Sequence, residues 1–200
     1  QFQEKFEKPY EKINDIIKFF MCLGNHDYGY DCGSNTTCNS ETNNSIYQVQ
    51  YGIESQKKNK KWFMPSNYYF FNKKLKDISV DYFVLDTNLD FMSPQEITEQ
   101  LNYFINKIND SNADWKILIG HHTWRSVAGH GNAEPQLESF LTELINKAPF
   151  DVYMCGHDHT KQLIQTKINN NDITMIVCGA GGKNYKDIPD NFDNTSDLIF

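Results

Sequence analysis

Three short segments of the chain combine glycine with side chains that can bind a metal ion. They are Gly24–Asp27, Gly120–His122 and Gly156–His159, and each follows a run of apolar residues. Neutral imidazole and carboxamide oxygen suit borderline divalent ions such as zinc, iron or manganese. Two imidazoles one residue apart, as in the third segment, are typical of metal ligands. Each segment alone is also consistent with a polar turn, but the three together predict a metal site.

The elements that must position these side chains alternate between strands and helices. The hydrophobic pattern predicts a loop over 31–45, helices near 3–15, 94–108 and 137–145, and strands over 19–23, 68–71, 80–85, 115–119, 152–155, 161–167 and 173–178. The strand at 68–71 follows a proline turn, which favours a sheet edge. Strands that alternate with helices indicate an α/β domain. Loops outside the carboxyl ends of its strands converge on one crevice, where the three segments can meet.

Length and charge limit the class of protein. The 200 residues are enough for one domain, over 1–200, with no internal linker. The formal net charge of −7 argues against a nucleic-acid partner, since such proteins present basic surfaces. No apolar run is long enough to predict a transmembrane helix.

Cysteine and asparagine patterns favour a secretory route. Cys32 and Cys38 enclose a short polar loop that a disulfide could close. Four asparagines begin N-x-S/T triplets and are candidate glycosylation sites: Asn35, Asn43, Asn109 and Asn194. We therefore expect a secreted or lysosomal-type compartment.

The three segments, in this order, resemble the motif series of the metallophosphoesterases. A finer similarity to the tartrate-resistant type of purple acid phosphatase rests on His130, which comes nine residues after His121, and on the segment Tyr153–His159. Leu85–Thr87 and Cys178–Gly181 also fall at positions typical of that family. The resemblance implies a calcineurin-like metallophosphoesterase fold, a four-layer α/β/β/α sandwich.

The resemblance also implies a role for each residue of the motifs. Asn25, His121 and His157 would bind a divalent metal, and His159 would bind a second metal, which is ferric in this family. His26 and His130 would be catalytic, beside the substrate phosphate. Asp27 and Asp158 would orient imidazoles, since carboxylates commonly do so at metal sites. His122 and Arg125 are candidate substrate contacts.

The implied activity is hydrolysis of phosphomonoesters by a metal-activated hydroxide, as in an acid phosphatase. The cofactors would be Fe(III) with a divalent Fe, Zn or Mn ion, and the substrate a small phosphoester or a phosphoprotein acted on by a monomer. The alternatives are a phosphodiesterase or nucleotide hydrolase on the same fold, or a non-catalytic scaffold with a degenerate metal site.

One departure from the family pattern concerns the ferric ion. Its other ligands in the family, two aspartates and a tyrosine, come from motifs that would precede Gly24, and no such motif is present. We therefore expect a fragment of a longer protein, truncated at both ends, which lacks the first motifs and the terminal strands. In that case the catalytic role belongs to the parent protein.

Overall fold

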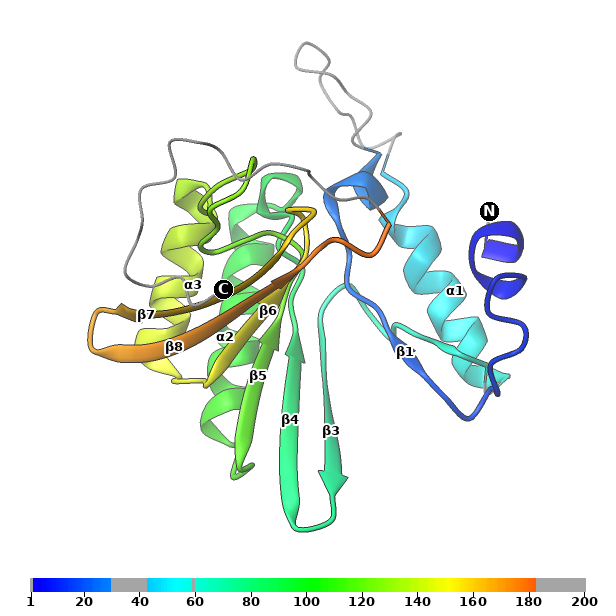
Figure 1. Cartoon of the computed structure of the whole chain (residues 1–200), viewed down its shortest axis with the longest axis horizontal. Coiled ribbons are helices and arrows are strands. Elements are labelled where there is room, and N and C mark those ends of the chain that lie inside the picture. The colour runs from blue at the N-terminus through cyan, green and yellow to red at the C-terminus, as the bar shows by residue number, and fades with distance from the viewer. Residues whose placement is uncertain (1, 30–42, 59, 183–200) are drawn as a thin grey trace.

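The computed structural model describes residues 2–29, 43–58 and 60–182 (Figure 1). In chain order the elements are η1 (Gln3–Glu7), β1 (Phe19–Phe20), η2 (Asn25–Tyr28), α1 (Ser45–Lys57), β2 (Trp62–Phe63), β3 (Tyr69–Leu75), β4 (Ile78–Val84), η4 (Leu89–Phe91), α2 (Pro94–Asn109), β5 (Trp115–Ile119), α3 (Pro135–Lys147), β6 (Val152–Cys155), β7 (Lys161–Ile168) and β8 (Asn171–Cys178).

A six-stranded mixed sheet in the order β3-β4-β5-β6-β8-β7 organises the molecule. Its four central strands, β4, β5, β6 and β8, are parallel, while β3 and β7 pair antiparallel at the two edges. The predicted edge position of the strand that follows the proline turn is confirmed. Because the central strands run in one direction, the loops after β4, β5 and β6 leave the same edge of the sheet.

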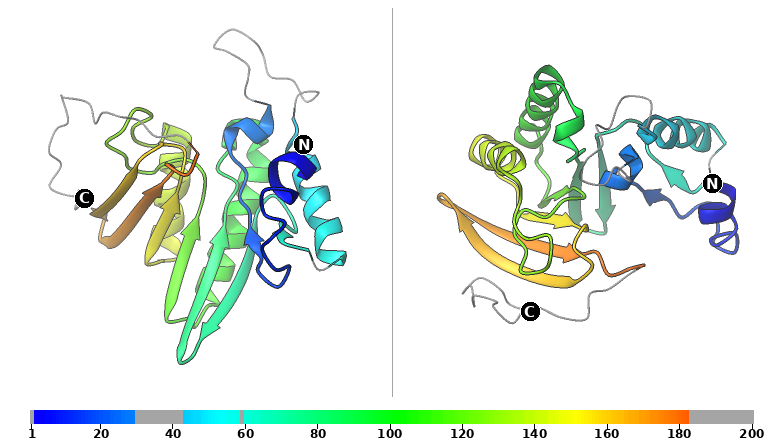
Figure 2. Two further views of the ribbon diagram at one scale, coloured as in Figure 1. Left: turned by 45° about the vertical axis from the view of Figure 1, so that its right-hand side comes forward. Right: turned by 90° about the horizontal axis from the view of Figure 1, so that it is seen from above.

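Helices α2 and α3 cover one face of this sheet (Figure 2). The main core lies between them, where Phe83, Leu118 and Tyr153 of the strands meet Phe104 and Leu141 of the helices, and all five are fully buried. Helix α2 begins at Pro94, where the sequence predicted a helix to start. Its N-cap is Ser93, which forms a reciprocal capping box with Glu96 before Pro94 opens the helix.

The opposite face of the sheet packs against a smaller unit at the β3–β4 end. Strands β1 and β2 form a parallel pair, and Phe20 of β1 stacks on Phe71 of β3 at 3.8 Å between ring centroids. A second core cluster joins this pair to Val84 of β4 and to Val49 of α1. From α2 to α1, the order here is helix, sheet, sheet and helix, which is the arrangement of a calcineurin-like metallophosphoesterase.

One sequence prediction about an element is wrong, and one helix was missed. The helix expected over 3–15 is a single π-helical turn, η1, followed by turns. Pro9 explains the break, because proline has no N–H and disfavours helical geometry at the residue before it. Helix α1 begins at Ser45, where the predicted loop ends, and it was not foreseen. It buries Ser45, Gly52 and Ser55, so no apolar stripe marks its inner face.

Candidate metal site and pocket

Side chains from three separate turns meet at the carboxyl ends of the strands. Asn25 opens η2, which follows β1, while His121 follows β5 and His157 follows β6. His121 Nε2 lies 2.9 Å from Asn25 Oδ1 and 3.1 Å from His157 Nδ1. The structure therefore places a possible ligand atom of Asn25 and one of His157 within 3.1 Å of His121 Nε2.

These contacts fit a cation better than a hydrogen-bonded cluster. One ring nitrogen carries at most one hydrogen, and an amide oxygen only accepts, so His121 Nε2 cannot serve both neighbours well. A cation instead draws on the lone pairs of all three atoms. With metal–ligand bonds of about 2.1 Å, neighbouring ligand atoms are about 3.0 Å apart at a right angle and about 3.4 Å apart in a tetrahedron. The observed 2.9 and 3.1 Å agree with the right-angle value.

Burial keeps the imidazoles of the cluster in their neutral form. Desolvation, together with the neighbouring histidines, lowers the pKa of His121 to about 3 and the pKa of His157 to about 4. Neutral imidazole is the form that binds metal ions.

The backbone also shows why particular residues occupy these turns. A Cβ atom on Gly24 would lie 3.0 Å from the His121 ring, so glycine allows the η2 turn to approach that ring closely. His157 has φ of 61°, in the left-handed region that residues other than glycine rarely adopt. Strained backbone of this kind persists where the surrounding structure holds it, and it clusters at functional sites.

His122 lies in the same cluster, although the family resemblance gives it no ligand role. Its ring lies with those of His121 and His157 in a group whose possible ligand atoms are all within 4.8 Å of one another. Thr87 Oγ1 accepts from the backbone N–H groups of both His121 and His122, at 3.2 and 3.1 Å. Both lone pairs of the hydroxyl are then used, so its hydrogen points to His122 Nδ1, 2.8 Å away. The ring proton of neutral His122 is therefore on Nε2.

His130 is held near the cluster through its backbone. Its exposed ring packs on that of His157 with 4.0 Å between centroids. The carboxylate of Asp158, fully buried, accepts from the His130 backbone N–H at 2.9 Å and from the Ser126 hydroxyl. Asp158 thus links the His157 turn to the loop that carries His130. The sequence predicted a different role for Asp158, the orientation of an imidazole.

The other predicted site residues lie as follows. His26 is exposed on η2, and Asp27 accepts from the Gly24 backbone at 2.8 Å and from the Gln48 side chain. His159 is half-buried two residues beyond His157, outside the three-histidine group. The Arg125 guanidinium pairs with both carboxylate oxygens of Glu138 on α3 rather than lining the pocket.

Two of the four predicted glycosylation sites lie within the described residues. Cys32, Cys38, Asn35 and Asn194 lie outside the described residues. Asn43 Oδ1 accepts from the Ser45 backbone at 2.9 Å at the start of α1, and Asn109 is exposed at the end of α2. Glycosylation at these asparagines stays a prediction.

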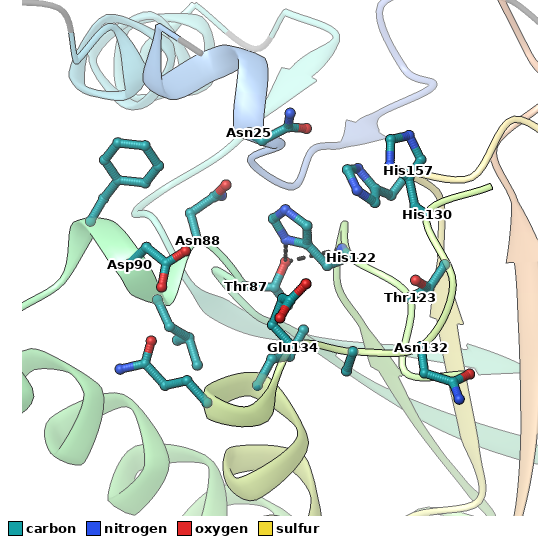
Figure 3. A pocket seen from close by; sticks show the side chains of 15 residues that line it. Asn25, Thr87, Asn88, Asp90, His122, Thr123, His130, Asn132, Glu134 and His157 are labelled. Carbon is teal, nitrogen blue, oxygen red and sulfur yellow. Dashed lines mark hydrogen bonds between the residues drawn. The ribbon is translucent and has the colours of Figure 1, made fainter. Parts of the chain in front are cut away.

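A pocket of about 290 Å³ opens beside the histidines (Figure 3). Its lining comes from five regions: the loop after β4, the loop after β5, the start of α3, the turn bearing Asn25 and the turn bearing His157. The lining residues are Asn25, Thr87, Asn88, Leu89, Asp90, Phe91, His122, Thr123, His130, Asn132, Ala133, Glu134, Gln136, Leu137 and His157.

Sequence reasoning did not assign a site role to Thr87 or Asn88. Both lie in the loop that follows β4, at the same edge of the sheet as the turns after β5 and β6. They lack the glycine and histidine that mark the other segments. The remaining signal was their place after a parallel strand, where loops contribute to the crevice.

The fold, with metal-ligating side chains at the carboxyl ends of its parallel strands, is that of the calcineurin-like phosphoesterases. The family described as calcineurin-like phosphoesterase matches residues 1–161, and the chain belongs to it. It is 27% identical over 204 residues to purple acid phosphatase 4 of Arabidopsis thaliana, and 26% identical over 198 residues to tartrate-resistant acid phosphatase type 5 of Homo sapiens. These matches cover 92% and 90% of this chain but 53% and 54% of the relatives. The chain thus spans about half the length of the curated relatives it matches.

Solved structures share the fold. A structure described as GAP50, the anchor in the inner membrane complex of Plasmodium, superposes with a TM-score of 0.70 at 21% identity, over 100% of this chain and 60% of that one. Purple acid phosphatase PPD1 from yellow lupin seeds superposes with a TM-score of 0.62 at 19% identity, over 90% of this chain and 33% of that one. Within the described part of the chain, every helix is too short or too polar to cross a membrane.

Proposed function

We propose that the protein binds a divalent metal ion through Asn25, His121 and His157 and takes part in the hydrolysis of phosphomonoesters. The observation that carries this proposal is the convergence of three lone-pair atoms beside a pocket, with separations of 2.9 and 3.1 Å. A divalent ion bound there supplies Lewis-acid polarisation and lowers the pKa of a bound water.

The chain's own side chains supply hydrogen bonds around the phosphate. Hydrolysis forms a bond from the water oxygen to phosphorus, breaks the bond from phosphorus to the ester oxygen, and yields an alcohol and inorganic phosphate. His122 presents its Nε2–H toward the pocket and can donate to a phosphate oxygen. His130 lines the pocket and His26 is exposed on η2 next to Asn25, and each is a candidate proton donor to the departing oxygen.

A second, ferric ion belongs to the proposal for the longer protein. His159 is its candidate ligand in this chain, and the remaining ligands would come from motifs outside it. The substrate would be a small phosphoester or a phosphoprotein, acted on by a monomer in a secreted or lysosomal-type compartment. The N-x-S/T triplets and the pair Cys32 and Cys38 support that location.

A non-catalytic scaffold is the second candidate function. One observation favours it: the described residues contain a single group of three metal-ligating histidines, cysteines or carboxylates, where a two-metal enzyme needs more. The superposition on a protein described as an anchor in a membrane complex shows the shared fold alone. Metal binding with hydrolysis separates the two candidates, because a scaffold would not turn over substrate.

The test combines metal analysis with phosphatase assays on the longest available form of the protein. We expect Asn25→Ala and His121→Ala to lose the divalent metal together with activity. His26→Ala should keep the metal and lose turnover by about 10²–10⁴-fold, the usual contribution of general-acid help. Asn170→Ala, at an exposed turn, is the matched control for Asn25.

Two results would contradict the proposal. Full metal content in both ligand variants would remove the metal site from this cluster. Metal binding without hydrolysis of p-nitrophenyl phosphate would leave the scaffold as the function, and turnover of bis(p-nitrophenyl) phosphate alone would make the protein a diesterase.

A further inference from the structure

A buried acceptor in the pocket has no donor among the described residues. Asn88 is 3% exposed and lines the pocket, and its Oδ1 makes no hydrogen bond within that part of the chain. Buried polar atoms of this kind are uncommon, because each one forgoes the hydrogen bonds it would make in water. The atom therefore indicates a place for a hydrogen-bond donor from a ligand.

The hydrogen-bond network fixes which end of the amide faces the pocket. Asn88 Nδ2 donates to the Leu23 carbonyl at 3.2 Å and to Asp86 Oδ1 at 2.8 Å. Asp86 Oδ1 also accepts from the Asn88 backbone N–H at 3.1 Å. Turning the amide over would set its oxygen against the two acceptors, so the free end must be oxygen. Figure 3 shows this end directed into the pocket on the side of Asn25.

The surroundings of this acceptor are negative and partly apolar. Among the described residues, the charged members of the lining are Asp90 and Glu134, and none is lysine or arginine. Leu89 and Phe91 flank Asp90 on η4 and also line the pocket. A second anionic group on a substrate would therefore find no partner here, whereas a cation would find carboxylates and an amide oxygen.

We propose that Asn88 determines specificity, accepting a hydrogen bond from an ammonium group on the leaving group of the substrate. The substrate class is then short aminoalkyl phosphomonoesters, with the phosphate toward the histidines and the ammonium between Asn88 and Asp90. An ammonium offers three donors and a positive charge, which match one buried acceptor and the neighbouring carboxylates. This inference rests on the proposed function, because it assigns the other end of the same substrate.

The test compares three substrates of similar size: 2-aminoethyl phosphate, propyl phosphate and 2-carboxyethyl phosphate. For the metal-loaded protein we expect kcat/KM to be about tenfold higher for the ammonium compound than for propyl phosphate, and lowest for the carboxylate. Binding of 2-aminoethylphosphonate and propylphosphonate, measured by calorimetry, should show the same order without turnover.

Two variants test whether Asn88 and Asp90 cause the preference for the ammonium substrate. Asn88→Leu should abolish the preference for the ammonium substrate and leave the metal content of the protein unchanged. Loss of the metal would instead make Asn88 Oδ1 a metal ligand and overturn the proposal. Because Asn88→Leu also removes bonds to Leu23 and Asp86, Asp90→Asn is the second variant, and it should reduce the preference severalfold. Asp77→Asn, at the exposed β3–β4 turn, is the matched control and should keep it.

The outcomes separate this inference from the proposed function. Equal kcat/KM for 2-aminoethyl and propyl phosphate, with both hydrolysed, would overturn the ammonium site alone. If neither these three substrates nor p-nitrophenyl phosphate were hydrolysed, the proposed function would be overturned. The phosphonate affinities would then still test the ammonium site, and equal affinities would reject it.

Discussion

At the scale of single residues, His157 combines a proposed ligand role with an unfavourable backbone. Its φ of 61° places it in the left-handed region, and its ring is partly buried beside three other imidazoles. Left-handed geometry costs roughly 1–2 kcal/mol for a residue that has a Cβ atom. The backbone geometry of His157 therefore lowers the stability of the fold, as is common at functional sites.

Replacing His157 by asparagine should separate stability from metal binding. Asparagine tolerates left-handed geometry better than histidine does, so His157→Asn should raise the free energy of unfolding of the metal-free protein by about 1 kcal/mol. The same change should abolish binding of the divalent ion. Urea denaturation with and without chelator measures the first effect, and metal analysis the second. A variant that is both less stable and metal-bound would contradict this account of the turn.

The sequence predicted the members of the cluster better than their contacts. Glycine followed by histidine or asparagine, after an apolar run, located Asn25, His121 and His157, and the structure brings these together. The partners of Asp158 were out of reach, because Ser126 and the His130 backbone meet it only through a loop that follows another strand. Asn88 was missed for a related reason: its significance lies in a buried side-chain oxygen to which no described residue donates a hydrogen bond.

At the scale of elements, α1 shows where hydrophobic periodicity fails. Its inner face carries small residues, while Ile46, Tyr47 and Ile53 are exposed. A Cβ atom on Gly52 would lie 2.2 Å from the Met64 carbonyl oxygen, so the helix depends on close backbone approach to the segment that follows β2. The strongly amphipathic helices α2 and α3 bury large apolar side chains instead, which made them predictable.

The glycine in α1 should therefore resist substitution by a better helix former. On an isolated helix, Gly→Ala is favourable by about 1 kcal/mol. In this protein we expect Gly52→Ala to lower the free energy of unfolding by about 1–3 kcal/mol, the usual range for overpacking. Thermal denaturation measures the change, and Gln50→Ala on the exposed side of α1 is the control. Stabilisation by Gly52→Ala would show that α1 does not pack against Met64 as described.

At the scale of the whole molecule, the layered α/β architecture followed from the alternation of strand and helix patterns. The strands over 115–119 and 152–155 have the predicted bounds. The contact of the small β1–β2 unit with the large sheet did not follow from local pattern, because it depends on aromatic side chains far apart in sequence. Only the family resemblance supplied that layer.

The N-terminal segment is joined to the β1–β2 unit by charge as well as by packing. Asp15 bridges Lys60 and Lys61, each at 2.8 Å, and hydrogen bonds from these two lysines lower the pKa of Asp15 to about 2. A carboxylate whose pKa is lower in the folded state stabilises the fold above its unfolded pKa. That contribution is lost as the pH falls from about 4 toward 2.

Asp15→Asn should thus lower stability at neutral pH and make no difference in strong acid. We expect the gap in free energy of unfolding between wild type and variant to be constant above pH 5, as the unfolded pKa of aspartate is about 3.9. The gap should close between about pH 4 and pH 2. Urea denaturation over this pH range measures it, with Asp77→Asn as control. A gap that persists at pH 2 would exclude the ion pair as its cause.

The wide spacing of Asn25, His121 and His157 along the chain constrains when the cluster can close during biosynthesis. His121 is 96 residues beyond Asn25, and His157 is 36 residues further on. At about 5–20 residues per second, the ribosome releases the last of the three roughly ten seconds after the first. Strand β6 must then enter the sheet before its turn can reach the others. Until His157 has emerged and β6 has joined the sheet, a nascent polypeptide therefore holds an incomplete set of the proposed ligands, and a cation cannot be bound by all three.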